Sequence, residues 1–125
     1  MPGVSDFTDL RVYRESVDLA QSIYNITNEW PAKEKYRMTD QILRSSRSVC
    51  ANIGEAWFKR AYPKHFASKL SDATSEAAET IVWIHLAQRS SLLDAPTANA
   101  LEARYRKTIG GLSRMIQDAD SWCNW

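Results

Sequence analysis

Residues 95–122 read APTANALEARYRKTIGGLSRMIQDADSW, and this stretch decides the fold class. Its core-forming positions recur at steps of three and four, the spacing of one face of an α-helix: Ala98, Leu101, Tyr105, Thr108, Leu112, Met115, Ala119 and Trp122. Asp94 precedes it as an N-cap residue, and Pro96 suits the first turn. Gly110 and Gly111 lie in the middle and cost about 1 kcal/mol each relative to alanine. We interpret them as a point where another helix packs closely, with a hinge as the alternative.

Three more segments carry helical spacing. The sequence therefore predicts helices at about 8–30, 35–61, 63–90 and 95–122. Pro31 ends the first helix, because a residue that precedes a proline disfavours the α region. No segment alternates at period two for long enough to form a strand. We predict an all-α fold, a single antiparallel up-down-up-down four-helix bundle that spans residues 1–125.

The first predicted helix carries two apolar stripes, whose centres are about 120° apart at 100° per residue. The stripe expected to face the core consists of Leu10, Tyr13, Val17, Ala20, Tyr24 and Thr27. The second stripe consists of Val12, Leu19, Ile23, Ile26 and Trp30. This excess of apolar surface predicts a second buried contact, either in a wide bundle groove or with another subunit. On the second predicted helix, the expected inner stripe is Tyr36, Leu43, Ser46, Cys50, Ile53 and Trp57.

The composition indicates the class of protein. The chain has 125 residues, of which 44% are hydrophobic and 25% charged, and a formal net charge of +1. These values are ordinary for a globular domain and exclude wholesale disorder. Residues 1–6 carry no signal-peptide features, and the longest apolar stretch, Ile81–Ala87, is too short to span a bilayer. We expect a cytoplasmic protein without a membrane partner, in which Cys50 and Cys123 stay reduced.

The sequence lacks the residue patterns that support catalysis. It contains no Gly-rich phosphate loop, no GxSxG elbow and no HExxH motif. His65 and His85 fall on one predicted helix, roughly 30 Å apart. Glu76 and Glu79 have no histidine three positions later, so the Glu-x-x-His pattern of di-iron bundles is missing. We predict a non-enzymatic protein with no catalytic residue, no metal site and no cofactor.

Basic residues concentrate between positions 33 and 69. This window holds nine Lys or Arg and three Asp or Glu, a net charge of +6 against −5 for the rest of the chain. Such a surface favours the binding of nucleic-acid phosphates, RNA or DNA. The alternative is a solvated helix face whose charges pair with neighbouring acids. The candidate nucleic-acid-binding residues are Arg37, Arg44, Arg47, Lys59, Arg60 and Lys64.

Aromatic residues lie among the last of these bases. We expect Trp57 in the core, because it lies on the inner stripe. Phe58 and Tyr62 are more open, and they lie either in the core, in an interface, or where they can stack on unpaired bases.

A line of polar residues follows one face of the second predicted helix: Arg37, Gln41, Arg44, Ser48, Asn52 and Glu55. Asn and Ser have modest helix propensity, so their place inside a helix needs another reason. One hypothesis is a hydrogen-bond network that fixes helix register or a subunit contact, formed by Gln41, Ser48, Asn52 and Glu55. The alternatives are a groove that contacts a ligand, and plain exposure to solvent.

An ordered set of residues runs along nearly the whole chain: Leu10, Val12, Tyr13, Trp30-Pro31, Glu34, Tyr36, Gln41, Arg44, Ser45, Ser48, Asn52-Ile53, Glu55, Arg60, Phe66, Leu70, Ala73 and Ser75-Glu76. This set resembles the bacterial four-helix-bundle proteins named after the 23S rRNA intervening sequence. Around Asn52 the family pattern has Ile-Pro where this chain has Val49-Cys50, and Gly where it has Ala56. Without the proline, we expect a straighter second helix.

The resemblance implies an antiparallel four-helix bundle that assembles with itself, most simply as a homopentamer shaped like a short barrel. It also implies a relation to the accessory proteins of diversity-generating retroelements, whose basic pentamers are thought to bind nucleic acid. We therefore predict an oligomeric nucleic-acid-binding or ribonucleoprotein accessory protein that uses the basic surface of the second helix. The alternative is a structural scaffold for protein–protein interaction with no nucleic-acid role.

Overall fold

The computed structural model of the chain describes residues 3–123, and this part is helical without a strand. Its helices are α1 (Arg11–Thr27), α2 (Asp40–Trp57), α3 (Pro63–Arg89), α4 (Ala95–Gln117) and the short α5 (Ala119–Cys123). Short 3-10 turns at Phe7–Asp9 and Ala32–Glu34 precede α1 and α2, and a π-helical turn, Lys35–Thr39, leads directly into α2.

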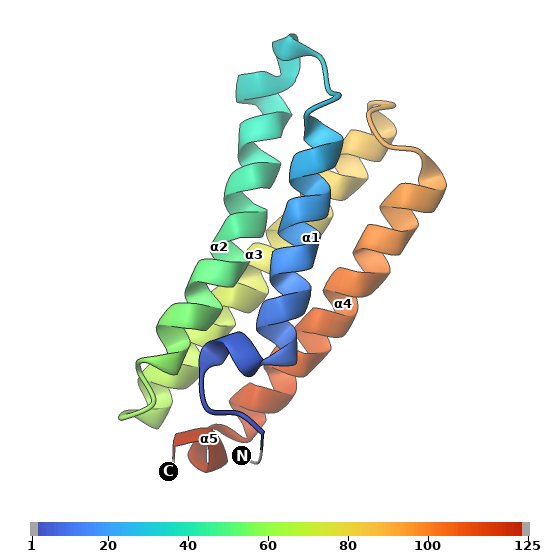
Figure 1. The fold of residues 1–125 in the computed structure, drawn as a ribbon. Coiled ribbons are helices and arrows are strands. Elements are labelled where there is room, and N and C mark those ends of the chain that lie inside the picture. Colours follow the sequence, from blue (N-terminus) through green and yellow to red (C-terminus); the bar gives the residue numbers. More distant parts are fainter. Residues whose placement is uncertain (1–2, 124–125) are drawn as a thin grey trace.

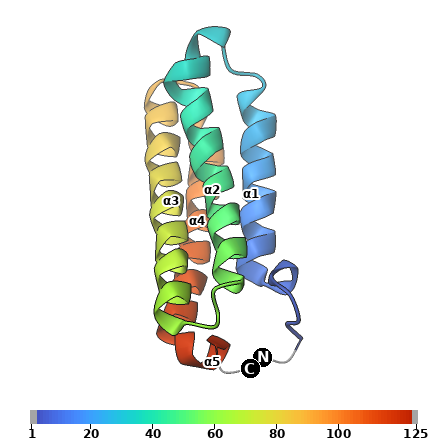
Figure 2. The ribbon, with the colours of Figure 1, turned by 90° about the vertical axis from the view of Figure 1, so that its left-hand side faces the viewer.

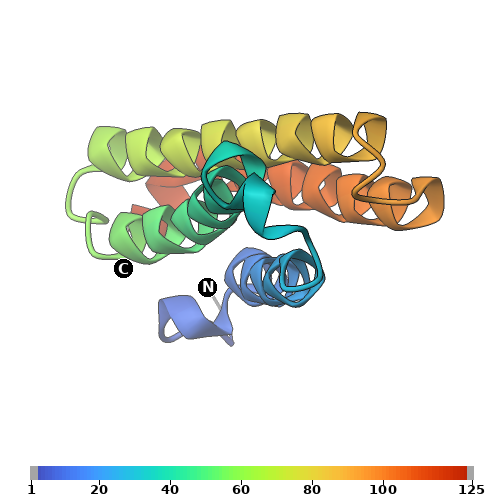
Figure 3. The ribbon, with the colours of Figure 1, turned by 90° about the horizontal axis from the view of Figure 1, so that it is seen from above.

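The four long helices run up, down, up and down, and each packs against the next (Figure 1). α1 contacts α2 and α4, and it lies across the bundle from α3, as the view from above shows (Figure 3). The start of α1, the α2–α3 turn, the end of α4 and α5 all lie at one end of the bundle (Figure 2). The predicted all-α bundle is therefore confirmed.

The helix ends differ from the predicted bounds mainly where a turn replaces the last residues. α1 is shorter than the predicted helix 8–30, because residues 28–30 form a turn in which the Trp30 N–H bonds the Thr27 carbonyl at 3.0 Å. The predicted helix 95–122 breaks at Asp118, which separates α4 from α5. The predicted start of α4 is confirmed: Asp94 Oδ1 accepts the Thr97 N–H at 2.8 Å, and Pro96 lies in the first turn.

The core lies where the spacing of α4 predicts it. Seven of the eight positions on that stripe, from Ala98 to Ala119, are buried, and Trp122 is half-buried. The α3 positions Phe66, Leu70, Ala73, Ala77, Ile81 and Ile84 complete the same core. α2 is continuous from Asp40 to Trp57.

The assignment of the two α1 stripes was wrong for the middle of the helix, although Leu10 and Thr27 of the first stripe are buried. The buried face of α1 carries Val12, Leu19 and Ile23, which belong to the second stripe. Val17 and Tyr24 of the first stripe are 39% and 41% exposed and face away from the core. Ser16 lies on the buried face because its hydroxyl donates to the Val12 carbonyl at 2.6 Å, which satisfies its polar group within the helix. Helical spacing identifies two apolar faces, but it does not say which one points inward.

Gly111 allows α1 and α4 to approach closely. A Cβ placed on Gly111 would lie 2.7 Å from Cγ1 of Val12, a distance that a folded protein does not tolerate. The same addition at Gly110 meets only Arg114 Nη1, at 3.8 Å. The interpretation of this pair as a close-packing point is confirmed for Gly111.

Candidate nucleic-acid interface

The α2–α3 turn presents two aromatic rings to solvent. α2 ends at Trp57, and Phe58 and Tyr62 in the following turn are 75% and 63% exposed. The Tyr62 ring lies 5.3 Å from the His65 ring, between centroids, at an interplanar angle of 51°. These rings are not part of the core, so that alternative for Phe58 and Tyr62 was wrong. Trp57 is 6% exposed and belongs to the core, as predicted.

Three of the candidate basic residues surround these rings. Lys59 and Lys64 are exposed and form no ion pair with the described residues. The Arg60 guanidinium lies 3.5 Å above the Trp57 ring, and its Nε donates to the Trp57 carbonyl at 2.9 Å. Burial against this ring lowers the pKa of Arg60. The turn therefore combines an arginine held against Trp57, two exposed lysines and two exposed aromatic rings.

The other three candidate bases lie elsewhere. Arg44 binds Glu76 and Glu79 of α3, which raise its pKa. Arg47 lies over the Tyr24 ring of α1, 5.6 Å from its centroid. Arg37 is exposed in the π-helical turn at the far end of α2, on the order of 30 Å from Lys59 at 1.5 Å per residue. The six residues do not form one continuous surface.

The polar line of α2 links this helix to α3. The Asn52 oxygen accepts from Lys69 Nζ at 3.0 Å, and its amide nitrogen donates to the Ser48 carbonyl at 2.9 Å. Glu55 lies 3.7 Å from the same Lys69 ammonium group. Gln41 is half-buried one turn before Arg44. Three of the six residues of this line, Arg44, Asn52 and Glu55, thus contact α3 of the same chain.

A groove between α1 and α2 is lined by the outward stripe of α1. It consists of two adjoining hollows of about 530 and 210 Å³ that share Arg47 and Cys50. The remaining lining residues are Phe7, Tyr13, Val17, Ala20, Gln21, Tyr24, Ala51, Gly54, Glu55 and Phe58. Burial raises the pKa of Cys50 to about 11, so its thiol is protonated at neutral pH. We name this feature the α1–α2 groove.

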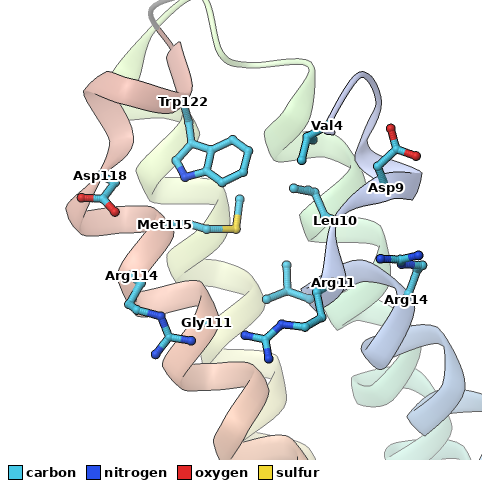
Figure 4. A pocket seen from close by; sticks show the side chains of 11 residues that line it. Val4, Asp9, Leu10, Arg11, Arg14, Gly111, Arg114, Met115, Asp118 and Trp122 are labelled. Carbon is cyan, nitrogen blue, oxygen red and sulfur yellow. The ribbon is translucent and has the colours of Figure 1, made fainter. Parts of the chain in front are cut away.

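A pocket of about 390 Å³ lies between the start of α1 and the end of α4 (Figure 4). Its charged residues include Arg11 and Arg114, and its apolar lining includes Leu10, Met115 and Trp122. The sequence analysis missed this site, because its residues come from opposite ends of the chain and only the bundle topology joins them. Gly111 was the sequence feature that could have indicated this region, because a glycine inside a helix suggests that another helix packs closely there. It does not indicate which helix that is.

Comparison with known proteins places the chain in a family. Residues 8–116 match the family model described as 23S rRNA-intervening sequence protein. The chain belongs to this family. It is also similar to a crystal structure from Bacteroides thetaiotaomicron VPI-5482, a protein with unknown function from the S23 ribosomal protein family. The TM-score is 0.74 at 29% identity, with 84% of this chain and 97% of the other covered. A search of curated proteins gave no match.

The candidate binding groups of this family member are the cations and aromatic rings of the α2–α3 turn and the apolar α1–α2 groove. Residues 3–123 contain no group of three or more His, Cys, Asp or Glu side chains that could hold a metal ion. None of the helices in that range is long and apolar enough to cross a membrane. Cys50 and Cys123 are both free thiols.

Proposed function

We propose that this member of the 23S rRNA-intervening sequence protein family is a non-enzymatic, homo-oligomeric nucleic-acid-binding protein. The proposed contact surface is the α2–α3 turn, defined by Phe58, Lys59, Arg60, Tyr62 and Lys64. The observation that carries the proposal is the pair of exposed aromatic rings among three basic residues. The relation to accessory proteins of diversity-generating retroelements, which the sequence resemblance implies, favours the same class of partner.

Exposed aromatic rings beside cations fit single-stranded nucleic acid better than duplex. Unpaired bases stack on aromatic side chains, and each stacked base contributes about 1–3 kcal/mol. Tyr62 is the stronger stacking candidate, since Phe58 packs against Phe7 with ring centroids 6.0 Å apart and lies at the border with the α1–α2 groove. Lys59 and Lys64 would contact phosphates, which position a strand without reading its sequence. Arg44 is excluded from this role because two carboxylates already neutralise it.

The binding test compares wild-type protein with K59A/K64A, Y62A and the control K33A/K35A, using a labelled single-stranded RNA and fluorescence anisotropy. Lys33 and Lys35 are exposed at the opposite end of α2. The control therefore removes the same amount of positive charge as K59A/K64A, but away from the α2–α3 turn. K59A/K64A and Y62A should each weaken binding about tenfold or more, as expected for lost phosphate contacts or one lost stack. Equal affinity of K59A/K64A and K33A/K35A would exclude the turn as the contact surface.

The α1–α2 groove is the proposed contact between subunits. Val17 and Tyr24 expose apolar surface on α1, and Cys50 and Ala51 continue this surface onto α2. Contiguous apolar surface of this kind marks interaction sites in soluble proteins. A ring of copies would also repeat the weak nucleic-acid contact of each subunit, which raises the overall affinity through avidity. The family resemblance supports five subunits.

The assembly test uses V17E, with V82E as the matched control. Val82 is 51% exposed on α3 and lies outside the groove, so it reports the general effect of a new carboxylate. Light scattering should give the mass of five chains for wild type and V82E, and a smaller mass for V17E. A monomeric wild type would overturn the oligomer. An oligomer that fails to bind RNA even at low salt would instead favour the protein-interaction scaffold.

A further inference from the structure

The pocket between α1 and α4 combines a charged mouth with an apolar lining. Its volume of about 390 Å³ falls within the range of roughly 300–1,000 Å³ that is typical of small-molecule sites. Leu10 and Met115 are buried at its lining, and Trp122 forms part of its wall. The Trp122 ring is held edge-on against Trp57, with centroids 6.5 Å apart. The pocket therefore has a fixed aromatic surface on one side.

Two arginines face each other across the mouth. A Cβ atom placed on Gly111 would lie 3.8 Å from Arg11 Nη2 and 3.9 Å from Arg114 Nη2, so the two guanidinium groups approach the same point. Figure 4 shows the two guanidinium groups pointing toward one another from α1 and α4. Neither forms an ion pair within residues 3–123. Like charges held this way repel each other, so an anion placed between them would be stabilised by both.

Neither acidic residue of the pocket forms an ion pair with these arginines within residues 3–123. The Asp9 carboxylate already accepts the backbone N–H groups of Ser5 and Asp6, at 2.9 and 3.1 Å. These hydrogen bonds lower the pKa of Asp9, and the bond from the Ser5 backbone N–H has the largest effect. Asp118 points away from the mouth in Figure 4. The lining carries three arginines, the third being Arg14, against the two aspartates Asp9 and Asp118, so its formal net charge is +1.

We propose that this pocket binds a small organic anion, with its carboxylate or phosphate between Arg11 and Arg114 and its apolar body against Leu10, Met115 and Trp122. The planar guanidinium group suits both anions, because its N–H donors match two oxygens at once. The apolar body distinguishes this ligand from free inorganic phosphate. The site shares no residue with the α2–α3 turn, so it stands apart from the nucleic-acid proposal.

The test is calorimetric titration of the full chain with four probes: 1-naphthyl phosphate, 1-naphthoate, inorganic phosphate and the neutral 1-naphthol. The pocket variant is R11Q/R114Q, and the control is R37Q/R89Q, which removes two exposed arginines at the other end of the bundle. All four positions are exposed, so both variants should keep the fold, which circular dichroism would verify.

At least one naphthyl anion should bind the wild type about tenfold more tightly than phosphate or naphthol do. Only a naphthyl anion can contact both the two arginines and the apolar lining of the pocket. R11Q/R114Q should lose about tenfold or more in affinity for that probe, and R37Q/R89Q should stay within about twofold. A preference between the two naphthyl probes would identify the anionic group. Equal affinity for all four probes, no saturable binding, or wild-type affinity in R11Q/R114Q would overturn the proposal.

Discussion

Replacing Gly111 with alanine tests the closest contact between α1 and α4. The new Cβ would lie 2.7 Å from Val12 Cγ1. Val12 is 6% exposed and β-branched, with one strongly preferred rotamer in a helix, so it cannot simply rotate away. Overpacking of this kind costs about 1–3 kcal/mol. Alanine has a higher helix propensity than glycine, which stabilises the folded state by about 1 kcal/mol and offsets part of this cost. We expect G111A to lower the free energy of unfolding by about 1 kcal/mol.

Gly110 supplies the matched control. G110A gains the same helix propensity and meets only the Arg114 guanidinium at 3.8 Å, so it should stabilise the protein by up to about 1 kcal/mol. Urea unfolding followed by circular dichroism measures both variants. In a V12A background the clash is gone, and G111A should become stabilising. If G111A is as stable as G110A, α1 and α4 do not pack as closely as described.

Three further predictions concern single side chains. Y105F should raise the free energy of unfolding by about 1 kcal/mol, because the buried Tyr105 hydroxyl has no hydrogen-bond partner among the described residues; a loss of stability in urea unfolding would reveal a partner. Hydrogen bonds from the side chain and backbone N–H of Thr97 lower the pKa of Asp94 below its ordinary value of 3.8. The ionised carboxylate therefore stabilises the fold at pH values above 3.8, and this stabilisation is lost as the pH falls below that value and Asp94 becomes protonated. The advantage of wild type over D94N in urea midpoint should therefore shrink between pH 5 and pH 2.5, whereas a constant difference would contradict this linkage. In a C123S background, the rate of Cys50 alkylation by iodoacetamide should rise about tenfold per pH unit from pH 8 to 10, since only the thiolate reacts and its pKa is about 11; a plateau near pH 9 would disagree.

The sequence predicts the bundle well where a helix has a single apolar face. On α4 one stripe of apolar and small residues contains every buried position except Gly111. α1 has two such faces, and spacing alone did not rank them. The inward face is the one that packs against α2 and α4, and that packing is not contained in the sequence of α1. Ser16 tolerates burial on this face because its hydroxyl bonds within its own helix.

The candidate site was predictable only where its residues are neighbours in sequence. Lys59, Arg60 and Tyr62 fall within one turn, and the turn keeps them together. Arg44 was named on the same charge argument, yet Glu76 and Glu79 of α3 neutralise it. Which acids meet which bases depends on the register between helices, which the sequence of one helix does not contain. The same reason explains why the pocket between α1 and α4 was missed.

The central claim is that the α2–α3 turn binds single-stranded nucleic acid through phosphates and stacking. Titration of a labelled single-stranded RNA at several salt concentrations tests this most directly. Log Kobs should fall linearly with log salt, with a slope of about −0.7 for each phosphate neutralised. K59A/K64A removes two phosphate contacts and should flatten that slope by about 1.4, while K33A/K35A leaves it unchanged. RNA that does not bind at low salt, or equal slopes in the two variants, would contradict the claim.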